Sequence, residues 1–147
     1  MSSQKIESHR DNAETYTNES QCKQKTIELL TKFSLPKGLI PMTDVTEVGH
    51  NPSTGFVWVR RKKKTQHLFS MISRKVSYDC EVTAFIEPGR MRNLTGVKSR
   101  ELLIWVTISD ISVVGDTGKI TFGTPTGLSR TFPVSAFDGD TNNDDEI

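Results

Sequence analysis

The residues with the clearest chemical potential are a run of consecutive basic side chains at positions 60–64. Together with Arg74 and Lys75 they make seven bases between Glu47 and Asp79 without one acid. Such a cluster can bind the phosphates of anionic lipid or, less favoured here, of nucleic acid, and it has the form of a nuclear-import signal. The simpler alternative is a solvated hairpin end with no partner. The predicted anion-binding residues are Arg60, Arg61, Lys62, Lys63 and Lys64.

Four aromatic side chains on predicted strands are the candidates for binding an apolar ligand. They lie in segments where side chains alternate between two faces, and a curled sheet would bring one of those faces to an enclosed interior. The competing interpretation is that these aromatic rings only fill a packed core. The predicted ligand-binding residues are Trp58, Phe69, Tyr78 and Trp105.

A complete catalytic or metal-binding motif is absent from the sequence. It has no phosphate-binding glycine loop, no nucleophile elbow and no zinc-protease motif, and its three histidines and two cysteines are scattered. A nucleophile and a base could come together only if the fold placed Cys80 or Ser129 near His67, with Asp79 orienting the imidazole. We therefore predict no catalytic residues, no metal and no cofactor.

Composition and length suit one soluble domain with one core. The chain has 147 residues and a formal net charge of +1, which does not fit a histone-like basic protein. Its longest apolar run, residues 102–106, is far shorter than the roughly 20 residues that span a bilayer. The first thirty residues contain no apolar core of a signal peptide. We expect an intracellular, cytoplasmic protein with nuclear or peripheral membrane association, in which Cys22 and Cys80 are free thiols.

The chain divides into three segments by composition. Residues 1–17 are polar and mixed in charge, which predicts a flexible lead-in or a frayed helix. Residues 18–137 form the single β-rich domain. Residues 138–147 carry five acids and no base and are predicted to be a disordered acidic tail.

The domain begins with one amphipathic helix over residues 18–33. Its apolar residues share one helical stripe, Asn18 or Ser20 can cap its start, and Pro36 ends it. The stripe consists of Cys22, Leu29, Leu30 and Phe33.

After Pro41 the apolar period changes to two, which is typical of strands. Residues 102–114 are predicted to be a central strand because the first half is apolar on both faces. Residues 87–90 are predicted to form a turn, because Pro88 and Gly89 suit its two central positions. Pro133 restricts the last strand to an edge. We predict an all-β fold, a curled antiparallel sheet forming a barrel or sandwich and preceded by the helix. The predicted strands cover residues 45–48, 56–60, 66–72, 75–86, 91–97, 102–114, 120–122 and 132–137.

Several blocks of sequence resemble one plant family, domain of unknown function 538 (DUF538). The segment LPKGLIP at 35–41 is similar to the family's motif before the strands. LTGVK at 94–98 and LLIWV at 102–106 are similar to its central block. PTGLSRTFPVSAF at 125–137 resembles the ending of a subgroup that includes a trichome protein.

The resemblance implies a barrel-like all-β fold comparable to the lipid-binding bactericidal permeability-increasing proteins. It also implies roles in stress response or trichome growth, with lipid or chlorophyll as ligand. No catalytic residues transfer with it. We expect a monomeric, non-enzymatic binding protein. The alternatives are a weak esterase acting on pigment or lipid esters, and an adaptor that uses the basic loop to contact anionic membrane or nuclear partners.

Overall fold

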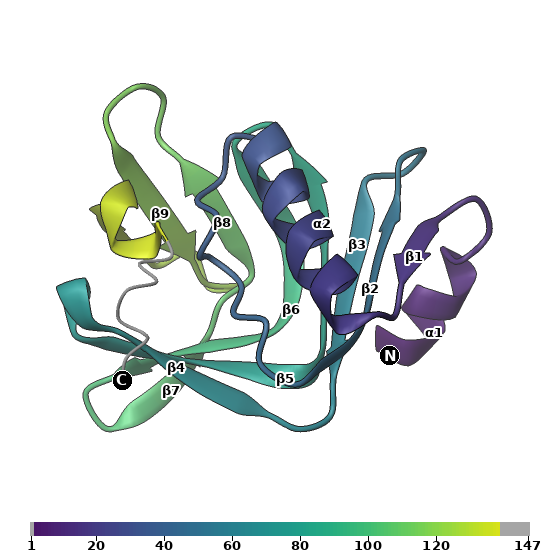
Figure 1. Cartoon of the computed structure of the whole chain (residues 1–147). Helices are drawn as coiled ribbons and strands as arrows, with labels where there is room; N and C mark the ends of the chain where they lie inside the picture. The colour runs from purple at the N-terminus through teal and green to yellow at the C-terminus, as the bar shows by residue number, and fades with distance from the viewer. Residues whose placement is uncertain (1, 139–147) are drawn as a thin grey trace.

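The computed structural model describes residues 2–138, in which ten strands form one antiparallel sheet accompanied by two α-helices (Figure 1). Residues 139–147, nearly all of the predicted acidic tail, lie outside the described residues. The helices are α1 (Ser2–Ser8) and α2 (Glu19–Lys32), and the short 3-10 helices are η1 (Ser70–Ile72) and η2 (Val134–Phe137). The strands are β1 (Glu14–Tyr16), β2 (Val45–Asn51), β3 (Phe56–Arg61), β4 (Thr65–Phe69), β5 (Arg74–Glu87), β6 (Arg90–Glu101), β7 (Ile104–Thr107), β8 (Asp110–Val113), β9 (Lys119–Gly123) and β10 (Ser129–Pro133).

Helix α2 confirms the predicted amphipathic helix. The Asn18 side chain accepts hydrogen bonds from the backbone N–H of Ser20 at 3.0 Å and of Gln21 at 3.2 Å, which caps the first turn. Cys22, Thr26 and Leu30 are buried on the face turned toward the sheet. The helix therefore covers part of the core, as the sequence pattern indicates.

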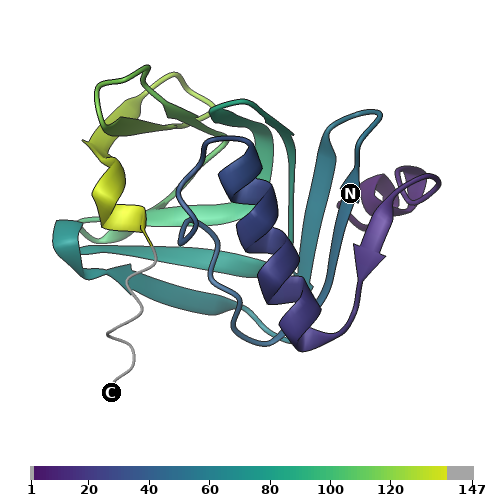
Figure 2. The same cartoon turned by 45° about the horizontal axis from the view of Figure 1, so that its top comes forward.

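The sheet is organised around the long hairpin of β5 and β6, which divides into two halves at one corner. The predicted turn at 87–90 is present, with Glu87 paired to Arg90. Beyond the corner, β5 exchanges β3 for β4 as its other neighbour, and β6 exchanges β8 for β7. In Figures 1 and 2 the half with β4 and β7 forms one layer, while β8 and β9 rise on another side of the interior.

Gly96 marks the corner. The paired register jumps from Thr83–Thr95 to Tyr78–Val97, so four residues of β5 lie opposite this one glycine. Gly96 has φ +83°, and a Cβ there would lie 2.4 Å from the carbonyl oxygen of Glu81. Only glycine fits this conformation and this approach of two backbones without a shift.

The interior of the curled sheet holds the main hydrophobic core. Side chains from α2, from the connector before β2 and from both halves of the sheet pack there, and η2 contributes Phe137. Tyr78 donates a hydrogen bond from its hydroxyl to the carbonyl oxygen of Leu39 at 2.9 Å, which ties the connector to β5. The predicted curled antiparallel sheet is confirmed, but closure into a barrel is not, because β1 and β10 end the strand order of the described residues.

Three predicted strands differ from the structure. Segment 102–114 is a turn followed by two separate strands, so the prediction of one continuous central strand is wrong. Among the described residues β7 pairs with β6 alone and lies at an edge, whereas β8 lies between β6 and β9. Segment 66–72 ends in η1 after Phe69. The last strand is β10, which ends at Pro133, and residues 134–137 form η2. The predicted edge position of that strand is confirmed by the sheet order.

The first residues of the chain form a helix, which is one of the two predicted alternatives, and a short strand, and both pack against the sheet. Helix α1 buries Ile6 completely against Phe56 and Trp58 on the outer face of β3. His9 stacks on Phe56 with ring centroids 4.2 Å apart. Strand β1 pairs with β2. The sequence pattern missed the packing of this segment because one apolar residue, Ile6, carries most of its burial.

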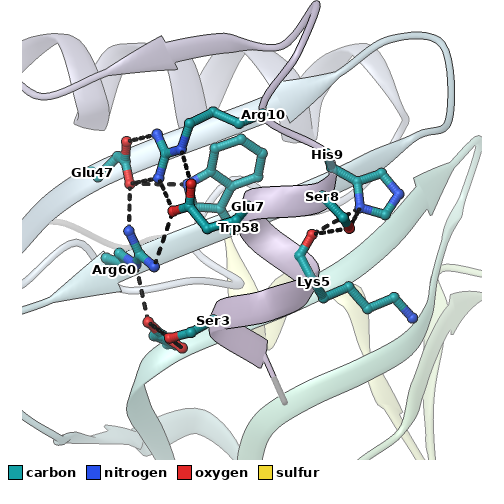
Figure 3. A network of polar contacts seen from close by, with 10 residues as sticks. Ser3, Lys5, Glu7, Ser8, His9, Arg10, Glu47, Trp58 and Arg60 are labelled. Atoms are coloured by element: carbon teal, nitrogen blue, oxygen red, sulfur yellow. Dashed lines mark hydrogen bonds and ion pairs between the residues drawn. The ribbon is translucent and has the colours of Figure 1, made fainter.

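A network of ion pairs lies beside Trp58 at one side of this small second core (Figure 3). Arg10 binds Glu47 at 2.6 Å and Glu7 at 3.0 Å, and Arg60 reaches Glu47 at 3.3 Å and Glu81 at 3.0 Å. The hydrogen bond from Arg10 holds the pKa of Glu47 below its ordinary value, so this carboxylate favours the folded state more at neutral pH than in acid. The network thus fixes α1 against β2, β3 and β5.

The close approach at the corner predicts that replacing Gly96 by alanine destabilises the protein more than replacing Gly118 does. Gly96→Ala should lower the free energy of unfolding by about 3 kcal/mol, because the new Cβ meets a backbone carbonyl. Gly118→Ala is the matched control, with φ +73° and open space around its Cβ, and should cost about 1 kcal/mol. Urea denaturation measures both values. Equal losses would show that the corner does not depend on this close approach.

The docking of α1 predicts a local, optically visible transition. Ile6→Asp should release the helix, because a carboxylate would be buried against Phe56 and Trp58 at a cost of about 3 kcal/mol. Trp58 emission should then shift to longer wavelength and become accessible to acrylamide. Gln4→Asp, at an exposed position of the same helix, is the control and should leave the emission unchanged. Unchanged emission in both variants would contradict the packing of α1.

Candidate functional site: an apolar groove between two hairpins

An apolar groove of about 640 Å³ lies between the β6–β7 hairpin and the β9–β10 hairpin. Leu103, Ile104 and Val106 form one side, and Leu128 and Phe132 form the other. Phe122 and Ile108, both buried, also line it and belong to the main core. The groove is therefore an opening into the interior of the curled sheet.

Large apolar side chains at the mouth of this groove are exposed to solvent. Leu102 is 93% exposed, Leu103 85%, Leu128 72% and Ile104 63%. Burying one such side chain fully is worth roughly 1.5–3 kcal/mol, so leaving four of them in water forgoes a substantial stabilisation. A contiguous exposed apolar surface of this kind marks a binding site more often than isolated apolar residues do.

Backbone geometry places the two walls. The register Glu101–Ile104 closes the β6–β7 hairpin with Leu102 and Leu103 alone in the turn. In the β9–β10 loop, the N–H of Thr124 donates to the carbonyl oxygen of Leu128 at 2.9 Å, and the N–H of Leu128 donates to the Thr124 hydroxyl at 3.2 Å. These bonds hold Leu128 at the rim.

Charged groups occupy one edge of the groove. Glu101 pairs with Arg74, and Arg130 lies 3.6 Å from the other carboxylate oxygen of Glu101. Arg74 also lies over the ring of Phe132, 5.3 Å from its centroid. Ser129 is on the same lining. The edge can therefore bind a polar group, while the rest of the lining is apolar.

The four aromatic residues predicted to bind a ligand do not meet around one cavity. Trp58 is on the outer face of the sheet under α1, where its indole lies directly over Gly49 and donates to Glu47 at 3.2 Å. Phe69 and Tyr78 are packed in the main core, and burial raises the pKa of the Tyr78 hydroxyl far above its ordinary value. None of these three lines the groove.

Trp105, the fourth, is half-buried on β7 beside the groove instead of in it. Arg100 lies over its ring at 5.4 Å on the outer surface of the β6–β7 hairpin. Alternation along the strand explains this placement, since Ile104 and Val106 line the groove and Trp105 lies between them.

The predicted basic loop is split between the two faces of β3. Arg60 joins the ion pairs near α1, while the next residue, Arg61, is buried and donates to the carbonyl oxygens of Pro41 at 3.1 Å and Thr43 at 3.2 Å. Lys62, Lys63 and Lys64 are exposed in the turn, and Lys64 lies 3.7 Å from Asp79. The structure thus presents three exposed lysines where the sequence suggested five exposed charges.

The candidate nucleophiles do not form a catalytic arrangement within residues 2–138. Neither Cys80 nor Ser129 has a hydrogen bond to a histidine there, and the Cys80 thiol lies near the Lys62 carbonyl oxygen, at 3.9 Å. His67 packs on Phe69, and burial lowers the pKa of its imidazole. Cys80 is exposed at the sheet corner. The cysteines of this part of the chain are free, as predicted.

Residues 2–138 contain neither a metal-binding cluster nor a helix that could span a membrane. No group of three or more His, Cys, Asp and Glu side chains in residues 2–138 is placed to hold a metal ion. Neither α1 nor α2 is long and apolar enough to cross a membrane.

The groove was not predicted from the sequence, although its residues were visible there. The apolar segment 102–106 favours a buried strand, and nothing in it signals a turn, since tight two-residue turns usually contain Gly, Asn or Asp. The useful signal for a turn would have been that this segment directly follows Arg100 and Glu101, the charged residues at the end of the preceding strand. Leu128, between Gly127 and Ser129, likewise sits in a sequence typical of a loop.

Comparisons with known proteins support one family. No curated protein and no solved structure matches the chain. A family model described as "Protein of unknown function, DUF538" matches residues 26–138, which include the second half of α2, the whole β5–β6 hairpin and both walls of the groove. Helix α1 and strand β1 precede the matched region. The chain therefore belongs to the DUF538 family.

Proposed function

We propose that this protein is a non-enzymatic binding protein that holds an apolar ligand of the lipid or chlorophyll class in the groove between β7 and β10. The observation that carries this proposal is the groove itself, with a volume of about 640 Å³ and a mostly apolar lining. Sites for small ligands commonly have about 300–1,000 Å³ and apolar walls with a few polar groups. The family resemblance extends the proposal to a role in stress response or trichome growth.

The energetic argument rests on the exposed leucines of the two walls. Contact with a ligand would remove apolar surface of Leu103 and Leu128 from water, at about 25 cal/mol per Å². Both residues lie on short hairpin connections whose backbones are already fixed by hydrogen bonds, so little ordering cost opposes binding. A mainly apolar ligand gains most from such a site.

The polar edge favours a ligand with a polar or anionic end. Arg130 is exposed, and its Nη2 lies 3.6 Å from Glu101 Oε1, which is long for a hydrogen-bonded ion pair. The guanidinium can therefore donate hydrogen bonds to a second, anionic partner. Ser129, the residue before it, also contributes to the lining. A chain with a carboxylate or phosphate head matches this division of apolar and charged surface.

Fluorescence of N-phenyl-1-naphthylamine tests the proposal, because this soluble apolar probe brightens in an apolar site. The wild-type protein should enhance its emission, and dodecanoate or chlorophyllide should displace it. Leu103→Asp combined with Leu128→Asp should weaken probe binding at least about tenfold, because both walls then carry a carboxylate. Both positions are exposed, so folding should not suffer.

Leu68→Asp is the matched control, since Leu68 is 54% exposed on β4 and does not line the groove. It should bind the probe as the wild type does. The two competitors separate an acyl ligand from a pigment. Equal affinity in the double variant and the wild type, or an equal loss in the control, would refute binding in this groove.

A further inference from the structure

The turn of the β6–β7 hairpin is unusual because it holds two highly exposed leucines, one of which has a strained backbone conformation. Leu102 has φ +54°, a left-handed conformation that branched and bulky residues rarely adopt. Leu102 and Leu103 are 93% and 85% exposed, so packing in residues 2–138 does not offset the strain. Strain of this kind at an exposed site is a reason to look for a function.

Basic and aromatic side chains surround this turn. Arg100 donates to the carbonyl oxygen of Leu102 at 3.1 Å and lies over the Trp105 ring. Lys98 is exposed on the same strand, and Arg130 is exposed across the groove. The carboxylate of Glu101 is already paired with Arg74 and Arg130. The surroundings of the leucine turn therefore carry more positive than negative charge.

This combination matches the chemistry of a bilayer surface. Apolar side chains enter the acyl region, tryptophan prefers the headgroup level, and each Lys or Arg near anionic lipid adds attraction. Long basic side chains can also keep their charge at the headgroups while their stems remain in apolar surroundings. The hairpin lies at the edge of the molecule, at the lower left of Figure 1.

We infer that the β6–β7 turn inserts Leu102 and Leu103 into an anionic membrane, so that the groove opens at the bilayer surface. This inference rests on the proposed function, because the same two leucines line the mouth of the groove. A ligand then passes between the bilayer and the groove without crossing water. The partner is a lipid surface, and the site is distinct from the lysines at 62–64.

Co-sedimentation with vesicles of phosphatidylcholine and phosphatidylserine at 7:3 tests the inference. The wild-type protein should bind these vesicles and bind pure phosphatidylcholine more weakly. Leu102→Asp combined with Leu103→Asp should reduce binding about a hundredfold. Lys98→Gln combined with Arg100→Gln should reduce it about tenfold or more, and added salt should reduce wild-type binding.

Lys62→Gln combined with Lys63→Gln is the control for charge, and it should bind vesicles as the wild type does. Trp105 supplies a second readout, because Trp58 is fully buried under α1. Brominated lipid should quench the wild-type emission, and Trp105→Phe should abolish the quenching while vesicle binding persists. Quenching that survives in this variant would contradict insertion of the β6–β7 turn.

The two proposals can fail separately. Lys98 and Arg100 do not line the groove, so their double variant should bind N-phenyl-1-naphthylamine normally. Probe binding without vesicle binding would overturn membrane insertion and leave the proposed ligand site intact. Vesicle binding without probe binding would overturn the ligand site. Loss of vesicle binding in the Lys62 and Lys63 control, or a dimer in solution that buries the leucine turn, would also overturn insertion.

Discussion

The close approach of two backbones at Gly96 is the constraint on which the rest of the structure depends. Because a glycine with φ +83° lies against the carbonyl of Glu81, the β5–β6 hairpin can turn a corner while both strands continue. One half of the hairpin is flanked by β3 and β8 and the other by β4 and β7. A flat hairpin would offer two open faces, whereas this one encloses a core.

The corner also explains where the groove is. The β6–β7 hairpin belongs to the half beyond the corner, whereas β9 and β10 extend, through β8, from the half nearer the 87–90 turn. The β6–β7 and β9–β10 hairpins therefore approach each other only across the interior. Among the described residues no strand pairing joins β7 to β10, and side chains of the main core line the gap between them. The opening is thus a consequence of a sheet that curls without closing. Its rim consists of large apolar side chains that no other part of residues 2–138 covers.

Local patterns predicted the elements well, and tertiary placement set the limits of prediction. The Asn18 cap, the α2 stripe and the 87–90 turn are determined by neighbouring residues, so the sequence was sufficient for them. The segment at 102–114 was misread because an apolar run does not reveal whether a neighbouring strand covers it. Arg61 illustrates the same limit, since its burial depends on carbonyl groups from the distant connector before β2. For the same reason, the sequence predicted a ligand site at four aromatic residues, whereas the groove in the structure lies between two hairpins and is lined by other residues.

Residue-resolved NMR of the labelled full chain, titrated with dodecanoate, tests the central claim most directly, because it locates binding without choosing a site beforehand. The account predicts that amide shifts concentrate in the 102–108 segment, around Phe122 and in the 124–132 segment, and that signals near Trp58 stay in place. Shifts centred on the β3–α1 face or on the lysines at 62–64, or no shifts at all, would contradict it.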